Sequence, residues 1–172
     1  RMCALGHRPI CQDTGIVTVF LKVGMNVTWD AIMSVTDMVN EGVRRAYTHP
    51  DNVLRASILE DPAGARKNTR DNTPAVIHYE IVEGDTLDVQ VAAKGGGSEN
   101  KSKLVMLNPS DSIVDWVVKT VPTMGAGWCP PGMLGIGIGG TAEKAAVLAK
   151  ESLMDPIDIH ELRERGPSNR IE

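Results

Sequence analysis

The chain has few aromatic residues, few cysteines and no excess of positive charge. Only 3% of its 172 residues are aromatic, and the formal net charge is −4. Nucleic-acid-binding proteins usually carry a basic patch, so this composition argues against a nucleic-acid partner. No apolar run reaches the ~18 residues that a membrane-spanning helix needs, and we therefore expect no membrane partner. With 42% hydrophobic and 23% charged residues, the composition is that of a globular protein.

The cysteines are too few and too widely spaced for a disulfide framework. There are three of them, Cys3, Cys11 and Cys129. An odd number at such separations indicates a reducing compartment, and we expect the cytoplasm. There is no C-x₂-C pair, so the sequence does not support a structural zinc site.

The sequence also gives no support for a serine hydrolase or for a nucleotide-binding site. The sequence contains no G-x-S-x-G, which a serine hydrolase of the α/β type would need. Gly135, Gly137 and Gly140 fit G-x-G-x-x-G, but Pro130 to Gly132 stand where a dinucleotide site requires a strand. No lysine follows Gly140, which excludes a P-loop. We interpret these glycines as positions of close packing before a helix N-terminus.

Hydrophobic patterns in the first third of the chain predict a strand followed by a helix. The β-branched run "IVTVFLKV", residues 16–23, is typical of a strand. From Thr28 to Thr48, apolar residues recur at helical spacing, which predicts an amphipathic helix capped by Thr28 or Asp30. Residues 51–58 could form another helical turn.

The middle of the chain carries the strongest hairpin signal. Residues 75–82 and 86–93 are strand-like segments that flank Gly84 and Asp85, a dipeptide typical of a tight turn. Residues 60–74 form a polar loop, and loops of ~15 residues are uncommon unless they are functional or mobile. Together the elements predict an α/β fold with a mixed sheet that contains a β-hairpin and is flanked by helices. A strand is expected at residues 134–138, and further helices at 110–121, 142–154 and 158–165.

A glycine-rich loop follows the second of these strands. Gly95, Gly96 and Gly97 tolerate positive φ, so their N–H groups could converge on one point. The next residues, "SENKSK", add hydroxyl and amide donors and positive charge. Converging amides beside a lysine predict an anion pocket, with an exposed flexible loop as the alternative.

Three motifs carry a resemblance to a known family. They are "PICQDTG", residues 9–15, "KGGGSENKS", residues 94–102, and "GWCPPGMLGIGIGGTAEKA", residues 127–145. In this order and at similar separations they resemble the N-terminal, or alpha, region of the class I, iron–sulfur-dependent fumarate hydratases. The related L(+)-tartrate dehydratase alpha subunit shares them. The resemblance covers essentially the whole chain.

The resemblance implies a 4Fe-4S cluster and a hydro-lyase activity. Cys11 and Cys129 would be two of three cluster ligands, and the third would lie beyond residue 172. We therefore expect residues 1–172 to be a fragment of the N-terminal catalytic domain, without the C-terminal, or beta, domain or subunit that completes the site. An open iron of such a cluster acts as a Lewis acid. A homodimer is also implied.

The resemblance also assigns residues to a small dicarboxylic acid, fumarate or malate. Asp13 would exchange a proton with the substrate hydroxyl, and Gln12 would hydrogen-bond a carboxylate. Gly15 would let the chain leave this crowded point. Arg55 is the expected carboxylate-binding arginine. The remaining expected substrate-binding residues belong to the glycine-rich loop: Gly97, Asn100, Lys101, Ser102 and Lys103.

Other functions stay open at this level. L-tartrate differs from malate by one hydroxyl, so tartrate dehydratase is a second enzymatic hypothesis. The isolated fragment could also be an inactive structural or assembly lobe. A phosphate-binding module that uses Gly95 to Gly97 is a further hypothesis.

Overall fold

The computed structural model describes residues 5–6, 15–129 and 132–168, and it divides the chain into two compact units. The first unit comprises Arg1–Glu99 and the second Asn100–Glu172. Among the described residues no helix is both long and apolar enough to cross a membrane. Cys3 and the predicted site residues Cys11, Gln12 and Asp13 lie outside the described residues.

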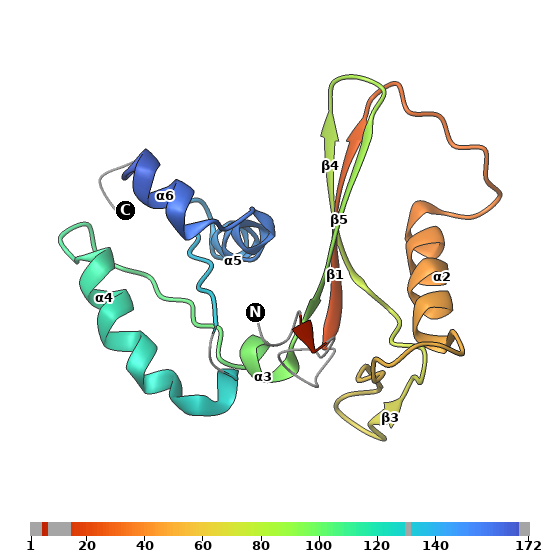
Figure 1. The fold of residues 1–172 in the computed structure, drawn as a ribbon, viewed down its shortest axis with the longest axis horizontal. Coiled ribbons are helices and arrows are strands. Elements are labelled where there is room, and N and C mark those ends of the chain that lie inside the picture. The colour runs from red at the N-terminus through yellow and green to blue at the C-terminus, as the bar shows by residue number, and fades with distance from the viewer. Residues whose placement is uncertain (1–4, 7–14, 130–131, 169–172) are drawn as a thin grey trace. The chain divides into compact units, whose positions relative to one another are not determined.

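The first unit is built on a three-stranded mixed sheet whose central strand is β1, Ile16–Gly24 (Figure 1). Strand β4, Val76–Val82, runs parallel to β1, and β5, Leu87–Lys94, runs antiparallel to it on the other side. The predicted strand at residues 16–23 is confirmed. Its continuous apolar sequence suits a central strand, which is covered by neighbours at both edges.

The predicted β-hairpin is wrong, although both of its strands exist. β4 and β5 each pair with β1 and not with each other, because β1 lies between them. The turn that joins them instead closes over the end of β1. Gly24 N–H donates to the Thr86 carbonyl at 2.9 Å, and Asn26 N–H donates to the Gly84 carbonyl at 2.9 Å. The turn signal at Gly84 is therefore local, whereas the pairing of the strands is decided by the more apolar β1.

Helix α2, Val35–Thr48, covers one face of this sheet (Figure 1). Its Val43 packs with four alternating side chains of β1 in the core of the unit, namely Val17, Val19, Leu21 and Val23. On the other face, the Phe20 ring stacks on His78 with ring centroids 4.7 Å apart. The alternation of β1 side chains therefore divides a helix-covered face from a more polar one.

The start of α2 differs from the prediction. Residues 28–34 are not helical, and neither Thr28 nor Asp30 is the cap. The N-cap is Ser34, whose hydroxyl oxygen accepts a hydrogen bond from the Asp37 N–H at 3.1 Å. The hydroxyl also donates to the Asp37 carboxylate at 2.7 Å, so the two side chains close the first turn together. Apolar periodicity alone extended the predicted helix too far towards the N-terminus.

The segment between α2 and β4 contains no further helical turn at residues 51–58, and that prediction is also wrong. Here the chain is extended up to a short antiparallel pair, β2, Leu59–Glu60, and β3, Lys67–Asn68. The polar loop at residues 60–74 is thus folded back on itself. It returns to the sheet beside the start of β1.

The second unit consists of short helices joined by extended segments. α4, Ile113–Thr120, is capped by Ser112, and α6, Ile159–Arg165, by Asp158. α5 is Ala142–Glu151, with Thr141 at the N-cap position. Two 3₁₀ helices complete the unit, η1, Val121–Trp128, and η2, Ser152–Met154. The helices predicted for this part of the chain are confirmed, with ends shifted by a few residues.

The repeated glycines of the second unit are packing positions. Residues 132–138 are extended, but they form no regular strand in the described part of the chain. A Cβ atom added at Gly137 would overlap the carbonyl oxygen of Ala145, and one at Gly135 would overlap that of Ala149. The segment therefore lies directly against α5, and this confirms the interpretation of close packing before a helix.

We expect Gly137→Ala to destabilise the second unit. The added methyl group cannot be accommodated without moving α5, and such overpacking costs about 1–3 kcal/mol. Gly42→Ala is the matched control, because no atom lies within 4 Å of a Cβ at this helical position. It should stabilise α2 by up to about 1 kcal/mol through helix propensity. Urea denaturation followed by circular dichroism measures both, and a Gly137→Ala protein as stable as wild type would contradict the packing.

Candidate active site

Gly15, at the start of β1, contacts two described segments that carry or adjoin sequence-predicted site residues, those of Ser57 and Lys94. It follows Cys11, Gln12 and Asp13 in the chain and leads directly into β1. Its φ is +54°, a conformation that glycine adopts at little cost. A Cβ atom here would overlap the carbonyl oxygen of Lys94 at the end of β5. Gly15 therefore stands at a point where the end of β5 leaves no room for a side chain.

The Gly15 carbonyl oxygen also accepts two side-chain hydrogen bonds from the Arg55 side of the site. The Ser57 hydroxyl donates to it at 3.0 Å, and the Asn72 amide Nδ2 donates to it at 3.1 Å. Ser57 is two residues from Arg55. The start of β1 and the segment that carries Arg55 are therefore joined at one atom.

Asn72 is the centre of this junction. Its side chain is completely buried, with 0% exposure, and its φ is 58°, which asparagine tolerates better than most residues. Its Oδ1 accepts from the Ser57 N–H at 2.8 Å and from the Ile58 N–H at 3.3 Å. The amide therefore satisfies backbone groups of two segments at once, using its oxygen on one side and its nitrogen on the other.

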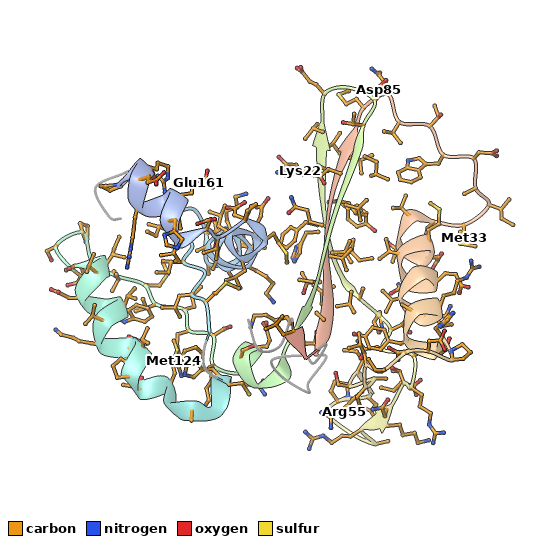
Figure 2. All side chains as sticks on the ribbon, viewed as in Figure 1. Lys22, Met33, Arg55, Asp85, Met124 and Glu161 are labelled. Carbon is orange, nitrogen blue, oxygen red and sulfur yellow. The ribbon has the colours of Figure 1, made fainter. Side chains whose placement is uncertain are left out.

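Arg55 itself is exposed. Figure 2 places it at the end of the sheet where β1 begins, away from Asp85 in the turn at the opposite end. A residue of the polar loop holds the neighbouring Ala56, because Asn68 Nδ2 donates to the Ala56 carbonyl at 2.8 Å. Leu54, on the other side, is held by Asn52, whose Oδ1 accepts from the Leu54 N–H at 2.9 Å and whose Nδ2 donates to the Leu54 carbonyl at 2.8 Å. The backbone is thus held on both sides of the exposed Arg55.

Asp71 ties the same polar loop to helix α2. Its carboxylate accepts from Arg44 Nε at 3.1 Å and from the Thr73 N–H and hydroxyl at 3.0 and 2.8 Å. Burial alone would raise the pKa of Asp71, but these hydrogen bonds outweigh burial and hold the pKa below its usual value of 3.8. Asp71 precedes Asn72, so this ion pair supports the junction from outside.

The glycine-rich loop does not form the expected anion pocket from its backbone. None of Gly95, Gly96 and Gly97 has positive φ, and Gly96–Glu99 is a short helix, α3. The loop is closed by its own side chains. Lys94 Nζ donates to the Ser98 hydroxyl at 3.0 Å, which in turn donates to the Gly95 carbonyl at 2.9 Å. A phosphate-binding nest at these glycines is therefore not supported.

Within the second unit, Lys101 lies beside the cysteine loop. A Cβ atom added at Gly127 would be 2.9 Å from Lys101 Cε, so the lysine stem covers this glycine two residues before Cys129. The Lys101 side chain is half-buried, whereas Asn100, Ser102 and Lys103 are exposed. The structure thus brings Lys101 and the Cys129 loop together.

Cys129 has an unusual backbone for a residue with a side chain. It ends the 3₁₀ helix in the left-handed region, with φ 60° and ψ 66°, and its N–H donates to the Ala126 carbonyl at 3.1 Å. Such a conformation costs on the order of 1 kcal/mol in a residue other than glycine and is often kept at functional sites. Its side chain is exposed. The described residues contain no group of three or more histidine, cysteine, aspartate or glutamate side chains placed to hold a metal ion.

The sequence analysis missed Ser57 and Asn72. Neither residue type is by itself a sign of a catalytic or binding site, and both hydrogen-bond to the backbone of other segments. The one available signal was the length of the polar loop that contains Asn72, which is unusual unless the loop has a role.

A comparison with known proteins decides the family. A family model described as "Fumarate hydratase (Fumerase)" matches residues 1–171. The chain belongs to the fumarate hydratase family. The match agrees with the resemblance of the three motifs.

Curated relatives in this family are longer than the chain. It is 40% identical over 157 residues to a "Putative L(+)-tartrate dehydratase subunit alpha" of Methanocaldococcus jannaschii, covering 87% of this chain and 54% of the relative. It is 29% identical over 154 residues to the L(+)-tartrate dehydratase subunit alpha of Escherichia coli K12, covering 88% and 50%. The chain therefore spans about half the length of the curated relatives it matches.

We expect Asp71→Asn to lower stability in a pH-dependent way. Because the folded-state pKa is depressed, the carboxylate contributes stability above the unfolded pKa, and the contribution is lost as pH falls through the folded pKa. At pH 7 the substitution should cost on the order of 1 kcal/mol, since Asn keeps acceptors but loses the charge that pairs with Arg44. The difference in melting temperature between wild type and Asp71→Asn should become smaller as the pH falls below about 4. Asp85→Asn, in the exposed turn, is the control, and a gap that is constant with pH would contradict the assignment.

Proposed function

We propose that the chain is part of a hydro-lyase that adds water to, or removes water from, a small dicarboxylic acid. The family match over residues 1–171 carries this proposal. The contact at Gly15 supports it, because Gly15 is two residues after Asp13 in the chain and accepts a hydrogen bond from Ser57, which is two residues after Arg55. The first candidate reaction is the interconversion of (S)-malate with fumarate and water.

The second candidate substrate is L-tartrate. The relatives from M. jannaschii and E. coli carry the name L(+)-tartrate dehydratase subunit alpha, and this favours a test with both diacids. The word alpha also supports a partner of the beta type, either a second subunit or a C-terminal domain. Steady-state assays of the full-length protein, or of its complex with that partner, on malate, fumarate and L-tartrate distinguish the two reactions. Turnover of none of them would refute the proposal.

The donor chemistry of Cys129 fits an iron–sulfur cluster. A thiolate is the preferred ligand of such clusters, and Cys129 presents its sulfur on an exposed, conformationally restricted turn. We propose Cys11 and Cys129 as two ligands of a 4Fe-4S cluster, with the third ligand supplied from outside this chain. When bound, a cluster with one open iron supplies Lewis-acid chemistry to a hydroxyl and a carboxylate.

The other residues bind the diacid and move its proton. Arg55, exposed beside a fixed backbone, is suited to bidentate binding of one carboxylate. Gln12 would donate its amide N–H to a carboxylate, and Asp13 would exchange a proton with the substrate. Lys101 would add positive charge beside Cys129.

The remaining members of the glycine-rich loop complete the proposed diacid contacts. These are Gly97, Asn100, Ser102 and Lys103. The alternative is that the isolated fragment is an inactive structural or assembly lobe, and it predicts that residues 1–172 alone bind no cluster.

We expect Cys11→Ser and Cys129→Ser to abolish cluster binding in the full-length protein. Serine keeps the size of the side chain but replaces the soft sulfur with a hard oxygen, which is a poor ligand for this cluster. Cys3→Ser is the matched control and should retain the iron content of wild type. Iron and sulfide analysis with absorbance spectra measure the outcome. An iron-to-protein ratio that Cys129→Ser leaves unchanged would remove this residue from the ligand set.

We expect Asp13→Asn to slow turnover while keeping the cluster. Asn has nearly the shape of Asp, but it cannot accept a proton, so kcat should fall by about 10²–10⁴. The KM of the diacid should change much less, since the amide still hydrogen-bonds. Cluster content and turnover are measured in the same preparations. An intact cluster with normal kcat would make Asp13 a structural residue.

A further inference from the structure

Trp128, the last residue of η1, packs its side chain on the backbone that follows the cysteine. A Cβ atom added at Gly132 would overlap Trp128 Cζ3 and Cε3 and would lie 3.2 Å from Cη2. The six-membered part of the indole therefore lies directly on the Gly132 Cα. In the sequence Trp128 is one position before Cys129, and Gly132 is three positions after it. The ring thus joins the backbone before the cysteine to the backbone after it.

Gly132 belongs to a segment that is itself held in place. It begins the extended segment of residues 132–138, which lies against α5 through the close approaches of Gly135 and Gly137 to that helix. The Trp128 ring therefore rests on backbone that α5 fixes. Within the second unit, this contact links the end of η1 to a helix further along the chain.

The conformation of Cys129 needs such support. Its φ of 60° and ψ of 66° are unfavourable for a residue with a Cβ atom. The next residue in the sequence is Pro130, and a residue before proline prefers an extended backbone. The hydrogen bond from the Cys129 N–H to the Ala126 carbonyl, at 3.1 Å, opposes both preferences. A backbone conformation of this kind persists only where the surrounding structure holds it.

We propose that Trp128 is a positioning residue for Cys129. By packing on Gly132, its ring holds the cysteine in the left-handed turn that presents the sulfur. A large rigid ring suits this role, because it makes many contacts and loses little conformational freedom when it packs. The importance of this sulfur rests on the proposed function, in which Cys129 is a cluster ligand. The hold on the turn rests only on the contact between Trp128 and Gly132.

Two substitutions break this contact from opposite sides. Trp128→Ala removes the ring. Gly132→Ala leaves every existing side chain in place and adds one methyl group where the ring lies. The φ of Gly132 is outside the left-handed region, so alanine fits its backbone and acts through the ring. Trp29→Ala is the matched control, because Trp29 belongs to the first unit and is 42% exposed.

The first readout needs no cluster and no substrate. In the metal-free full-length protein, amide hydrogen exchange is followed by mass spectrometry in a peptide of residues 126–131. The two prolines at its end have no N–H, so the peptide reports on residues 127–129. Trp128→Ala and Gly132→Ala should each raise its exchange rate about fivefold or more, because the relaxed turn releases the Cys129 N–H. Trp29→Ala should leave this rate as in wild type.

A peptide from α5, residues 142–151, is the internal reference. A general loss of stability in the second unit would raise the exchange rate of this peptide as well as that of residues 126–131. A positioning role predicts a change in residues 126–131 alone. The comparison is made at a temperature well below the melting temperature of each variant.

The double variant tests whether both substitutions act through one contact. In Trp128→Ala no ring remains for a methyl group at position 132 to displace. Adding Gly132→Ala to it should therefore change the exchange rate of residues 126–131 by less than about 1.5-fold. Two independent effects on local opening would multiply instead, and that result would contradict the proposal.

The second readout is the rate at which an iron chelator in excess removes iron from the loaded full-length protein. Supports behind a metal ligand typically change metal affinity by about 10- to 100-fold. We expect Trp128→Ala and Gly132→Ala to release iron about 10-fold faster than wild type. Trp29→Ala should stay within about twofold of wild type.

Unchanged exchange of residues 126–131 in Gly132→Ala would overturn the proposal, and so would an equal rise in the α5 peptide. If Trp128→Ala does not fold, Gly132→Ala still carries the test, because it keeps the tryptophan. If the wild-type full-length protein binds no iron, the proposed cluster fails. The exchange rates then still decide whether Trp128 holds Cys129 in its turn.

Discussion

The structure of the first unit depends on how the chain enters β1. The carbonyl oxygen of Gly15 accepts from Ser57 and from Asn72, and no side chain fits at Gly15 because the end of β5 is directly against it. A shift of this residue would disturb the register of β1 with both neighbours, since each pairs along nearly its whole length. One backbone position thus couples the central strand to the segments proposed to act on substrate.

The junction is stabilised in layers from the surface inwards. At the outside, Arg44 of α2 pairs with Asp71, and the adjacent Asn72 is fully buried. Exposed ion pairs contribute little by themselves, but this one restrains the loop that delivers the amide. A buried amide with all partners in place rigidifies its surroundings, whereas one with a missing partner costs about 1–3 kcal/mol. The polar loop therefore holds the start of β1 and the Ser57–Ile58 segment together.

In the second unit, close packing at glycines and a left-handed turn determine the local structure. Its glycines at 135 and 137 allow an extended segment to lie against α5, and its cysteine occupies a left-handed turn. Both features depend on backbone geometry, and the Cys129 side chain at the turn is exposed. Backbone geometry therefore decides the surroundings of Gly15 in the first unit and of Cys129 in the second.

Local signals determined the elements of this protein, and the three motifs determined its family. The strand at residues 16–23, the helices at 142–154 and 158–165 and the close-packed glycines depend on neighbours in the chain, and the sequence predicts them for that reason. The predicted hairpin was wrong because pairing depends on which strand is most apolar, and a turn at Gly84 cannot express that. The expected positive φ at Gly95 to Gly97 was wrong, because the backbone here forms a short helix that Lys94 and Ser98 close with their side chains. Only the tertiary structure decided that Gly15, Ser57 and Asn72 meet, because hydrogen bonds between residues 57 positions apart in the chain leave no periodic trace in the sequence.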